Sequence, residues 1–377
     1  MPERRVMYCI PSLVPGGAER VAVLLSNAAV ERGYTVELVT ATGGGFWSER
    51  LDARVSWRVL GHEGPFARGG TPKLWRAIRD FQPDIFHGFL NMGLYYGALL
   101  SRLTGVKLIV GNLDTVPSGI AFSKLEERVA RFCVRRAAHV ACAAGESVAQ
   151  SFHTEWGIPR EKLVVVPNAV ECAAIPFRDA ALRAATRREL GLVDDEVALL
   201  SVGRLSPEKG WEQLVTAAAE VAPRFPRARW LLAGEGALRP RLEELIATHG
   251  LGERFRLLGI RSDLVRLLQA ADLFVLSSHY ESGPIALLEA MAAGLPAVST
   301  RVGLAEGLVV PGQTGWPVPP GDAPALAAAL ACALSEQAHW PAYGTEARRR
   351  VEAEYDFPRI VERYFAFYDA WFARHGG

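Results

Sequence analysis

The chain has 377 residues, more than a single ordinary hydrophobic core accommodates, and this length predicts two domains. Half of the residues are apolar and 22% are charged, which is a globular composition. The net charge of +1 argues against nucleic acid as a partner of the whole molecule. Residues 1–185 nevertheless carry a net charge of +5 and residues 186–377 carry −4, which favours an anionic partner for the first half.

Cysteine usage and hydropathy indicate a cytoplasmic protein. The five cysteines form no C-x-x-C pair, so neither a zinc ribbon nor a redox pair is predicted. No run of 18 apolar residues predicts a membrane-spanning helix, and the apolar start of the chain is too short for a signal peptide. We expect a cytoplasmic location that leaves room for peripheral attachment to the inner face of the membrane.

Short apolar runs alternate with helical patterns along the whole chain, which predicts two doubly wound parallel α/β domains. In the first half, strands are predicted at 6–10, 35–40, 85–87, 107–110, 139–143 and 163–166, and helices at 18–32, 73–81 and 124–136. In the second half, strands are predicted at 197–202, 230–233, 255–258, 273–277 and 297–299.

The domain boundary is expected after 166–168, which gives a first domain of 1–173 and a second of 174–357. An aromatic-rich final helix within 358–377 is expected to pack back on the first domain. If the two sheets face each other, their carboxyl ends meet at a cleft, and ligands of open α/β sheets bind at such ends.

Two loops after predicted strands carry groups that could bind an anion. Gly16 and Gly17 follow the first strand and open a helix, where free backbone N–H groups attract phosphate; a tight turn is the alternative. Gly203, Arg204 and Lys209 follow the first strand of the second domain. A guanidinium and an ammonium five residues apart can converge on one diphosphate, and a solvated turn is the alternative.

Two further loops contain glycine or acidic motifs. The run 233–239 imitates a G-x-G-x-x-G fingerprint, but Arg239 replaces the last glycine, which disfavours a nicotinamide site and favours close packing of a glycine turn. In the run 281–289, Pro284 suits the first helical position, Glu281 precedes the helix and Glu289 lies on its second turn. Because Glu289 interrupts an apolar stretch, we expect a buried carboxylate that needs sugar hydroxyls or an arginine as partners.

No metal site is predicted, because no histidines lie four apart and no D-x-D pair occurs. A diphosphate bound here must therefore be neutralised by Arg204, Lys209 and helix N-termini.

With these motifs in order, the chain resembles the retaining glycosyltransferases of family 4, which have the GT-B fold of two Rossmann-like domains. The resemblance runs nearly end to end. It rests on the GGAER motif at 16–20, on 166–168, 202–210, 233–236 and 280–300, and on the E-x7-E spacing of Glu281 and Glu289.

The resemblance implies roles for these residues and no required cofactor, with a UDP- or GDP-sugar as donor substrate. Arg204 and Lys209 would bind the donor diphosphate without a metal, Glu289 the ribose and Glu281 the region of the donor sugar. Gly16 and Gly17 would lie beside the phosphates or the acceptor. The remaining donor contacts would come from Gly203, Ile260, Arg261, Ser282, Gly283, Pro284, Ile285, Ala286 and Leu287.

One position departs from the family pattern. Many members place a histidine in the loop after the fourth strand of the first domain, where this chain has Leu113 or Asp114. Asn112 or Asp114 would then contact the donor sugar or the acceptor in its place. His87 follows an earlier strand and is a further candidate, although a single histidine there is more often structural.

Lys124, Arg128, Arg131 and Arg135 fall on one narrow face of the predicted helix 124–136. Such a stripe is either a solvated face or a surface for anionic lipid. The family resemblance implies a hexosyltransferase, and together with the basic face it implies a sugar or lipid-linked acceptor of the cell envelope. A sugar-nucleotide epimerase or a phosphorylase of the same fold, and a catalytically silent sensor, remain alternatives.

Overall fold

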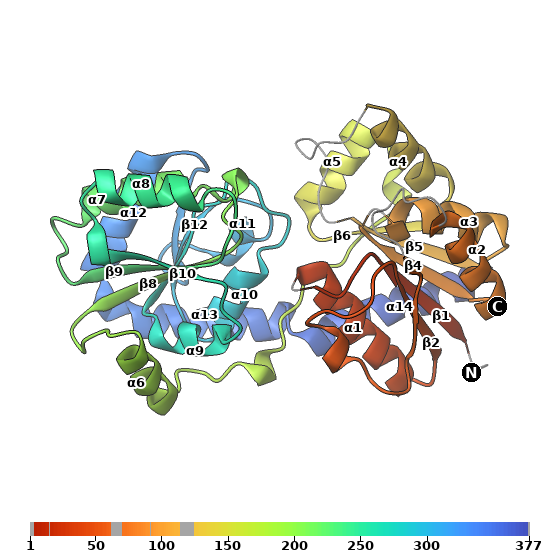
Figure 1. The fold of residues 1–377 in the computed structure, drawn as a ribbon, viewed down its shortest axis with the longest axis horizontal. Helices are drawn as coiled ribbons and strands as arrows, with labels where there is room; N and C mark the ends of the chain where they lie inside the picture. Colours follow the sequence, from red (N-terminus) through yellow and green to blue (C-terminus); the bar gives the residue numbers. More distant parts are fainter. Residues whose placement is uncertain (1–3, 15, 62–69, 91, 114–123, 376–377) are drawn as a thin grey trace. The chain divides into compact units, whose positions relative to one another are not determined.

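The computed structural model describes residues 4–14, 16–61, 70–90, 92–113 and 124–375 (Figure 1). The chain forms two compact units, one of Met1–Asn168 with Ile360–Gly377 and one of Ala169–Arg359. The division after Asn168 lies five residues before the boundary expected at 173. Its physical reason is that Val170 and Cys172 bond to the second unit: the Val170 amide donates to the Tyr355 carbonyl (3.0 Å) and the Cys172 amide to Asp356 Oδ1 (3.0 Å).

The first unit is built on a parallel sheet of seven strands in the order β3-β2-β1-β4-β5-β6-β7. The strands are β1 (Arg5–Ile10), β2 (Thr35–Thr40), β3 (Ser56–Val59), β4 (Ile85–Phe89), β5 (Leu108–Leu113), β6 (Val140–Ala143) and β7 (Leu163–Val165). The central strands are almost wholly buried, as expected of a parallel sheet covered on both faces.

Helices cover this sheet and connect its strands. They are α1 (Gly17–Glu31), α2 (Gly70–Phe81), α3 (Ala98–Leu103), α4 (Lys124–Arg136) and α5 (Glu146–Trp156), with a π-helical turn at Met92–Gly97. Shorter 3₁₀ turns lie at Ser48–Arg50 and Arg160–Lys162.

The final helix, α14 (Phe357–His375), packs on the first unit through its residues from Ile360 onward. Its buried side chains recur every three or four positions, so one face of the helix is apolar. Two ion pairs tie its other side to the unit: Arg4 Nη1 lies 2.7 Å from Asp369 Oδ1, and Arg32 contacts Glu362.

The second unit contains a six-stranded parallel sheet in the order β10-β9-β8-β11-β12-β13. The strands are β8 (Val197–Val202), β9 (Ala228–Ala233), β10 (Phe255–Gly259), β11 (Leu273–Leu276), β12 (Ala297–Thr300) and β13 (Gly315–Val318). The helices are α6 (Ala180–Glu189), α7 (Trp211–Val221), α8 (Arg239–Thr248), α9 (Leu264–Ala270), α10 (Ile285–Ala292), α11 (Ala305–Leu308), α12 (Ala323–Ser335) and α13 (Trp340–Glu354). Short 3₁₀ turns lie at Cys172–Ala174, Pro207–Lys209, Gly252–Arg254 and Gln337–His339.

The sequence prediction of two doubly wound parallel sheets is confirmed. It missed two strands, β3 and β13, which both lie at an edge of their sheet. Strand β3 is only partly buried, and β13 contains Pro317, which cannot donate to a ladder and suits an edge strand. Because β3 was missed, the strand that ends near Asn112 is the fifth strand rather than the fourth.

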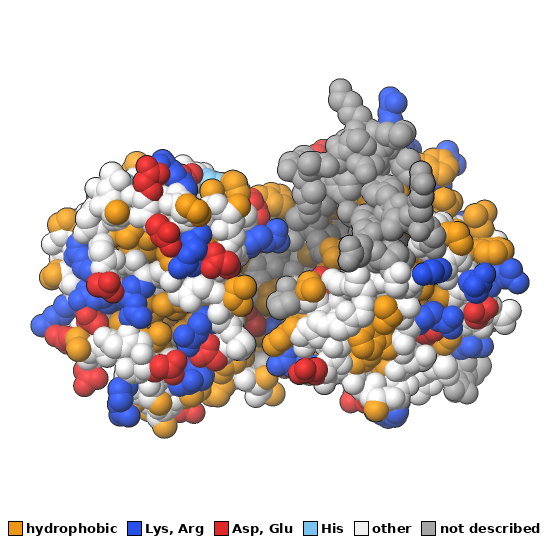
Figure 2. All heavy atoms as spheres, viewed as in Figure 1, with side chains coloured by type: hydrophobic (Ala, Val, Ile, Leu, Met, Phe, Trp, Pro, Cys, Tyr) orange, Lys and Arg blue, Asp and Glu red, His pale blue; other side chains and the backbone are white. Residues whose placement is uncertain are grey.

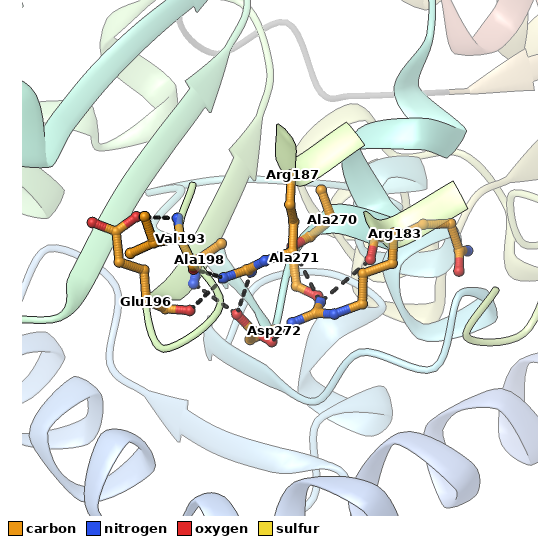
Figure 3. A network of polar contacts seen from close by, with 9 residues as sticks. Arg183, Arg187, Val193, Glu196, Ala198, Ala270, Ala271 and Asp272 are labelled. Carbon is orange, nitrogen blue, oxygen red and sulfur yellow. Dashed lines mark hydrogen bonds and ion pairs between the residues drawn. The ribbon is translucent and has the colours of Figure 1, made fainter. Parts of the chain in front are cut away.

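A partly buried charge network joins the amino ends of β8 and β11. Figure 3 shows Arg183 and Arg187 of α6 converging on Asp272, at 2.6 Å and 3.2 Å. Asp272 Oδ2, which Arg187 contacts, also accepts a hydrogen bond from the Ala198 amide at 2.8 Å. This network holds β11 beside β8, two strands whose own ladder pairs only two residues on each side.

Candidate functional site

The strand order of the second sheet reverses between β8 and β11. The chain leaves β8 toward β9 and β10 and later returns to the other side of β8 with β11. In open α/β sheets ligands bind outside the carboxyl ends of the strands at such a switch point. The loops that follow these two strands carry Lys209 and Glu281.

Lys209 and Glu281 form an ion pair at this point. Lys209 Nζ lies 2.5 Å from Glu281 Oε1, and the two side chains are 22% and 14% exposed. Glu281 Oε1 also accepts a hydrogen bond from Ser278 Oγ (2.8 Å). The structure therefore brings together two predicted site residues that are far apart in the sequence, and shows that they bind each other.

The two loops also meet through their backbones. Ser277 Oγ donates to the Lys209 carbonyl (2.9 Å), and the His279 amide donates to the Glu208 carbonyl (2.8 Å). Gly210 has φ = 67°, and a Cβ there would lie 2.0 Å from the Ser277 carbonyl oxygen. Only glycine satisfies both the conformation and the contact, so Gly210 allows the Lys209 loop to lie close to the loop after β11.

Arg204 lies on the same loop and is exposed, and it makes no ion pair or side-chain hydrogen bond with any residue that the structure describes. Its carbonyl accepts from Trp211 Nε1 (2.8 Å), which anchors the loop to α7. Gly203 precedes it and packs against the Trp211 ring. The guanidinium is thus held at the carboxyl edge by its backbone, and its charge faces solvent.

The glycine turn after β9 is explained by packing, as the sequence indicated. A Cβ on Gly236 would lie 2.5 Å from the Leu205 carbonyl oxygen, and the Leu238 amide donates to that carbonyl (3.0 Å). Arg239, which breaks the fingerprint, pairs with Glu235 (2.9 Å). This turn packs against Leu205, the residue after Arg204, and hydrogen-bonds to it.

Helix α10 begins at Ile285, and Pro284 is its N-cap rather than its first helical residue, a correction of one position. The amides of Leu287 and Leu288 both donate to the Pro284 carbonyl. Glu289 is half-buried rather than buried. The apolar run that suggested deep burial reflects neighbours on the other faces of the helix, since Leu288 and Ala290 are fully buried.

The loop before α10 rests on the segment after β12. The Leu304 amide donates to the Ser282 carbonyl (3.2 Å), and Gly303 has φ = 49° with no room for a Cβ beside the Glu281 carbonyl. Gly283 is buried in the same loop, whereas Ala286 is partly exposed on α10.

Ile260 and Arg261 follow β10 at the same edge. Ile260 is 79% exposed, so its side chain is available to a ligand. The Arg261 guanidinium is bound by Asp263 (2.7 Å) and Glu189 (3.2 Å), and these carboxylates raise the pKa of Arg261. Backbone groups rather than the Arg261 charge are therefore what this segment offers.

In the first unit, Gly16 and Gly17 lie at the start of α1, as expected. A Cβ on Gly16 would lie 2.1 Å from Glu19 Oε2, so the Glu19 carboxylate folds back over the helix start. Burial raises the pKa of Glu19. The backbone groups predicted to attract a phosphate already have a carboxylate beside them.

Asn112 belongs to a buried polar chain rather than standing alone. Tyr368 OH lies 2.5 Å from His87 Nδ1, His87 Nε2 lies 3.1 Å from Asn112 Oδ1, and Asn112 Nδ2 donates to Tyr364 OH (3.1 Å). Since Asn112 Oδ1 only accepts, His87 carries its proton on Nε2 and accepts from Tyr368. Burial lowers the pKa of His87 to about 4. His87 is fully buried, and Asp114 lies outside the described residues.

Ser277 and Ser278 are the site residues that sequence reasoning missed. Both are buried, and their hydroxyls bind the Lys209 carbonyl and the Glu281 carboxylate. Their only sequence signal was their position directly after β11, because hydroxyls at the carboxyl end of a central strand are candidates for a site.

The basic stripe of α4 is partly visible. Arg128 and Arg135 are exposed and Arg131 is partly buried, while the side chain of Lys124 lies outside the described part. Phe132 is 57% exposed beside them. Figure 2 also shows Lys and Arg side chains gathered over α2 and α3 of the first unit, whereas both signs of charge are interspersed on the visible face of the second unit. Within the described ranges, no helix is long and apolar enough to cross a membrane.

A cavity of about 500 Å³ opens at the amino edge of the second sheet, away from the candidate site. Arg183 and Asp272 line it, and both belong to the network of Figure 3. These two side chains bind each other (2.6 Å), so neither charge is left unpaired in the cavity.

Comparison with known proteins gives the family. Residues 183–351 match the glycosyl transferases group 1 and residues 15–174 match glycosyltransferase family 4. The amylovoran biosynthesis glycosyltransferase AmsK of Erwinia amylovora is 30% identical over 311 residues, which are 78% of this chain and 73% of that protein.

One further relative and one solved structure are similar to this chain, and the structure bears on the fold alone. The alpha-D-kanosaminyltransferase of Streptomyces kanamyceticus is 32% identical over 249 residues, and the match spans 63% of each chain. The structure of Anabaena Alr3699/HepE in complex with UDP and glucose has a TM-score of 0.86 at 22% identity, covering 98% of this chain and all of that one. The GT-B fold is thereby confirmed, and the chain belongs to the family 4 glycosyltransferases.

Proposed function

We propose that this protein transfers a hexosyl group from a UDP- or GDP-sugar to a hydroxyl of a sugar or lipid-linked acceptor, with retention at the anomeric carbon. The observation that carries the proposal is the Lys209–Glu281 pair at the switch point of the second sheet, with the exposed Arg204 guanidinium on the same loop. The donor is supported by HepE, whose structures hold UDP, and UDP-glucose.

The chemistry follows from where charge develops. When the bond between the sugar and the diphosphate breaks, negative charge grows on the leaving oxygen, and fixed cations stabilise it. Arg204 supplies a planar fork of donors and Lys209 a single ammonium, both held by backbone contacts of their loops. These two cations and the amides at the start of α10 would carry the diphosphate without a metal.

Glu281 and Glu289 take different tasks in this proposal. Glu289 would bind the ribose hydroxyls from the half-buried face of α10. Glu281 would face the donor sugar, and a donor phosphate oxygen would take the proton from the acceptor hydroxyl. Asn112 of the first unit, and Asp114, would contact the sugar or the acceptor.

A screen of nucleotide sugars by melting temperature tests the donor. We expect one UDP- or GDP-sugar to raise the melting temperature in a concentration-dependent way. Proton NMR of the product would then show the same anomeric configuration as the donor, and turnover would survive EDTA. Nucleotide release that needs no acceptor would favour an epimerase, and the absence of any shift would refute the proposal.

We also propose that the first unit attaches to anionic membranes through α4. Arg128, Arg135 and Phe132 present two cations and an aromatic ring on the exposed side of the helix. Flotation with vesicles that contain phosphatidylglycerol should bring the protein to the top of the gradient. The variant Arg128→Glu/Arg135→Glu should stay at the bottom, and Arg224→Glu, an exposed arginine of the second unit, should float.

A further inference from the structure

Two arginines bind the carboxyl end of α10, the helix whose amino end carries the candidate donor contacts. Helix carbonyls at a C-terminus have no partner within the helix, and cations beside them complement the helix dipole. In α10 the amides of Gly294 and Leu295 satisfy the Met291 and Ala290 carbonyls. The carbonyls of Ala292 and Gly294 are bound by arginines from elsewhere in the chain.

Arg348 of α13 joins three segments. Its Nη1 donates to the Ala292 carbonyl and to the Ile175 carbonyl (2.8 Å), and its Nη2 donates to the Cys172 carbonyl (3.0 Å). Glu352 binds its Nε at 2.5 Å, and the side chain is 16% exposed. One guanidinium thus uses all its edges to fasten the end of α10 to α13 and to the segment before α6.

Arg178 makes a second attachment. Its Nη2 donates to the Gly294 carbonyl (3.2 Å) and to the carbonyls of Trp340 and Pro341 (3.1 Å each) at the start of α13. Its backbone has φ = 51°, a left-handed conformation that costs a non-glycine residue about 1 kcal/mol or more. Such a cost persists where the surrounding structure holds the residue in place, and the Arg178 side chain makes three carbonyl bonds here.

Helix α13 approaches α10 closely enough for both arginines to reach (Figure 1). A Cβ on Gly344 would lie 1.9 Å from the Gly294 carbonyl oxygen and 2.3 Å from Arg178 Nη2. Glycine at 344 therefore makes room for the same contact that Arg178 completes. Three separate features of the sequence serve one end of one short helix.

We propose that Arg348 and Arg178 are positioning residues for nucleotide-sugar binding, because they fix the direction and the rotation of α10. The inference rests on the proposed function. Helix α10 has eight residues, about 12 Å of length, so a tilt at its carboxyl end moves its amino end almost rigidly. The Glu289 carbonyl accepts from the Ala293 amide directly beside the clamped carbonyl of Ala292, so the rotation of Glu289 depends on this end.

A purely structural role predicts a different outcome. If the arginines only stabilise the fold, a variant that is fully folded at the assay temperature binds nucleotide like the wild type. If they position α10, the same folded variant binds nucleotide more weakly. Arg256 is a matched control. Its Nη1 donates to the Leu190 carbonyl (2.5 Å) at the end of α6, and α6 is a helix that carries no candidate donor contact.

The experiment compares Arg348→Met, Arg348→Lys, Arg178→Met and Arg256→Met. UDP and GDP are titrated calorimetrically at a temperature about 15 °C or more below the lowest melting temperature of the set. Circular dichroism checks that each variant is folded at that temperature. For the nucleotide that the wild type binds, we expect about a tenfold rise in Kd for Arg348→Met. Arg348→Lys should keep part of the affinity, since one ammonium replaces one of the carbonyl bonds. Amide exchange across 285–292 should be faster in Arg348→Met and unchanged in Arg256→Met.

Steady-state kinetics adds a second readout once a donor is known. The KM for the donor should rise more than kcat falls in Arg348→Met and Arg178→Met. Wild-type Kd and wild-type exchange of α10 in folded Arg348→Met and Arg178→Met would overturn the inference, as would an equal loss of affinity in Arg256→Met. A wild-type protein that binds neither UDP nor GDP would instead refute the proposed function, and this inference with it. If Arg348→Met does not fold, Arg348→Lys and Arg178→Met decide the question.

Discussion

The Lys209–Glu281 pair allows a prediction in which two substitutions have opposite effects on one measurement. Lys209 is bound to Glu281 in the unliganded protein, and both side chains are mostly buried. A diphosphate that uses Lys209 must compete with that carboxylate or share the ammonium with it. Removing the ammonium should therefore weaken UDP binding, whereas neutralising the carboxylate should strengthen it.

The magnitude follows from the contact. One hydrogen bond between charged groups contributes ~1.5–3 kcal/mol, which corresponds to roughly 10- to 150-fold in an equilibrium or a rate. Lys209→Met should therefore weaken UDP binding and lower kcat/KM by at least about tenfold. Glu281→Gln keeps the shape and the hydrogen bond from Ser278 and releases the ammonium, so UDP should bind up to about tenfold more tightly while turnover still falls.

The assay is calorimetric titration of UDP, or of GDP if the wild type prefers it, followed by turnover with the donor found in the screen. Glu208→Gln is the matched control. It removes a carboxylate next to Lys209 in the sequence that is bound to Ser206 Oγ (2.6 Å) rather than to the ammonium. Glu208→Gln should leave affinity within about twofold of the wild type, well below a single charged contact.

A double-mutant cycle separates the pair from the ligand. Chemical denaturation of the two single variants and the double variant should give a coupling energy of about 1–3 kcal/mol in the unliganded protein. If Glu281→Gln weakens UDP binding as much as Lys209→Met does, Glu281 does not compete with the diphosphate for Lys209. Wild-type turnover in Lys209→Met would show that Lys209 does not act on the donor.

Three further predictions concern the scaffold. Gly210→Ala should lower turnover at least about tenfold, because its Cβ would collide with the loop after β11. The control is Gly191→Ala, which has the same left-handed backbone but open space around it. This variant should keep full turnover despite its own backbone strain. Gly344→Ala should lower the melting temperature although alanine is favoured in helices by about 1 kcal/mol, and a rise would contradict the close contact with α10. Because the pKa of His87 is about 4 in the folded protein and near 6.5 unfolded, the unfolded state binds the proton more tightly, and acidification from pH 6.5 to 4 should remove about 3 kcal/mol of stability. Denaturation of His87→Gln over the same range should show a shallower slope, and an unchanged slope would show that His87 does not carry the effect.

The sheets could be predicted because their central strands are continuous apolar runs. Strands β2 and β8 were predicted with the bounds that the structure shows. Strand β3 could not be predicted, because its residues are only partly buried and show no clear period of apolar side chains. Strand β13 contains Pro317, which is unfavourable within a sheet and is tolerated here because β13 is an edge strand.

The site was predictable residue by residue but not as a contact. The spacing and loop positions of Lys209 and Glu281 indicated function, yet nothing in the sequence shows that residues 72 apart form an ion pair. That contact requires the loop after β8 to approach the loop after β11 closely, which Gly210 allows because it has no Cβ. The burial of Glu289 was overestimated because an apolar helix with one carboxylate does not reveal which face is covered.

The placement of α14 has a consequence for the order in which the protein folds during synthesis. The first unit contains residues 1–168, but its sheet is covered in part by a helix that begins at Phe357 and is made after the second unit. Until then His87 and Asn112 lack Tyr368 and Tyr364, their partners on that helix. The second unit, whose residues are contiguous, can complete its core first, since domains generally fold as units while the chain emerges. The half of the chain that leaves the ribosome first is therefore the half that finishes folding last.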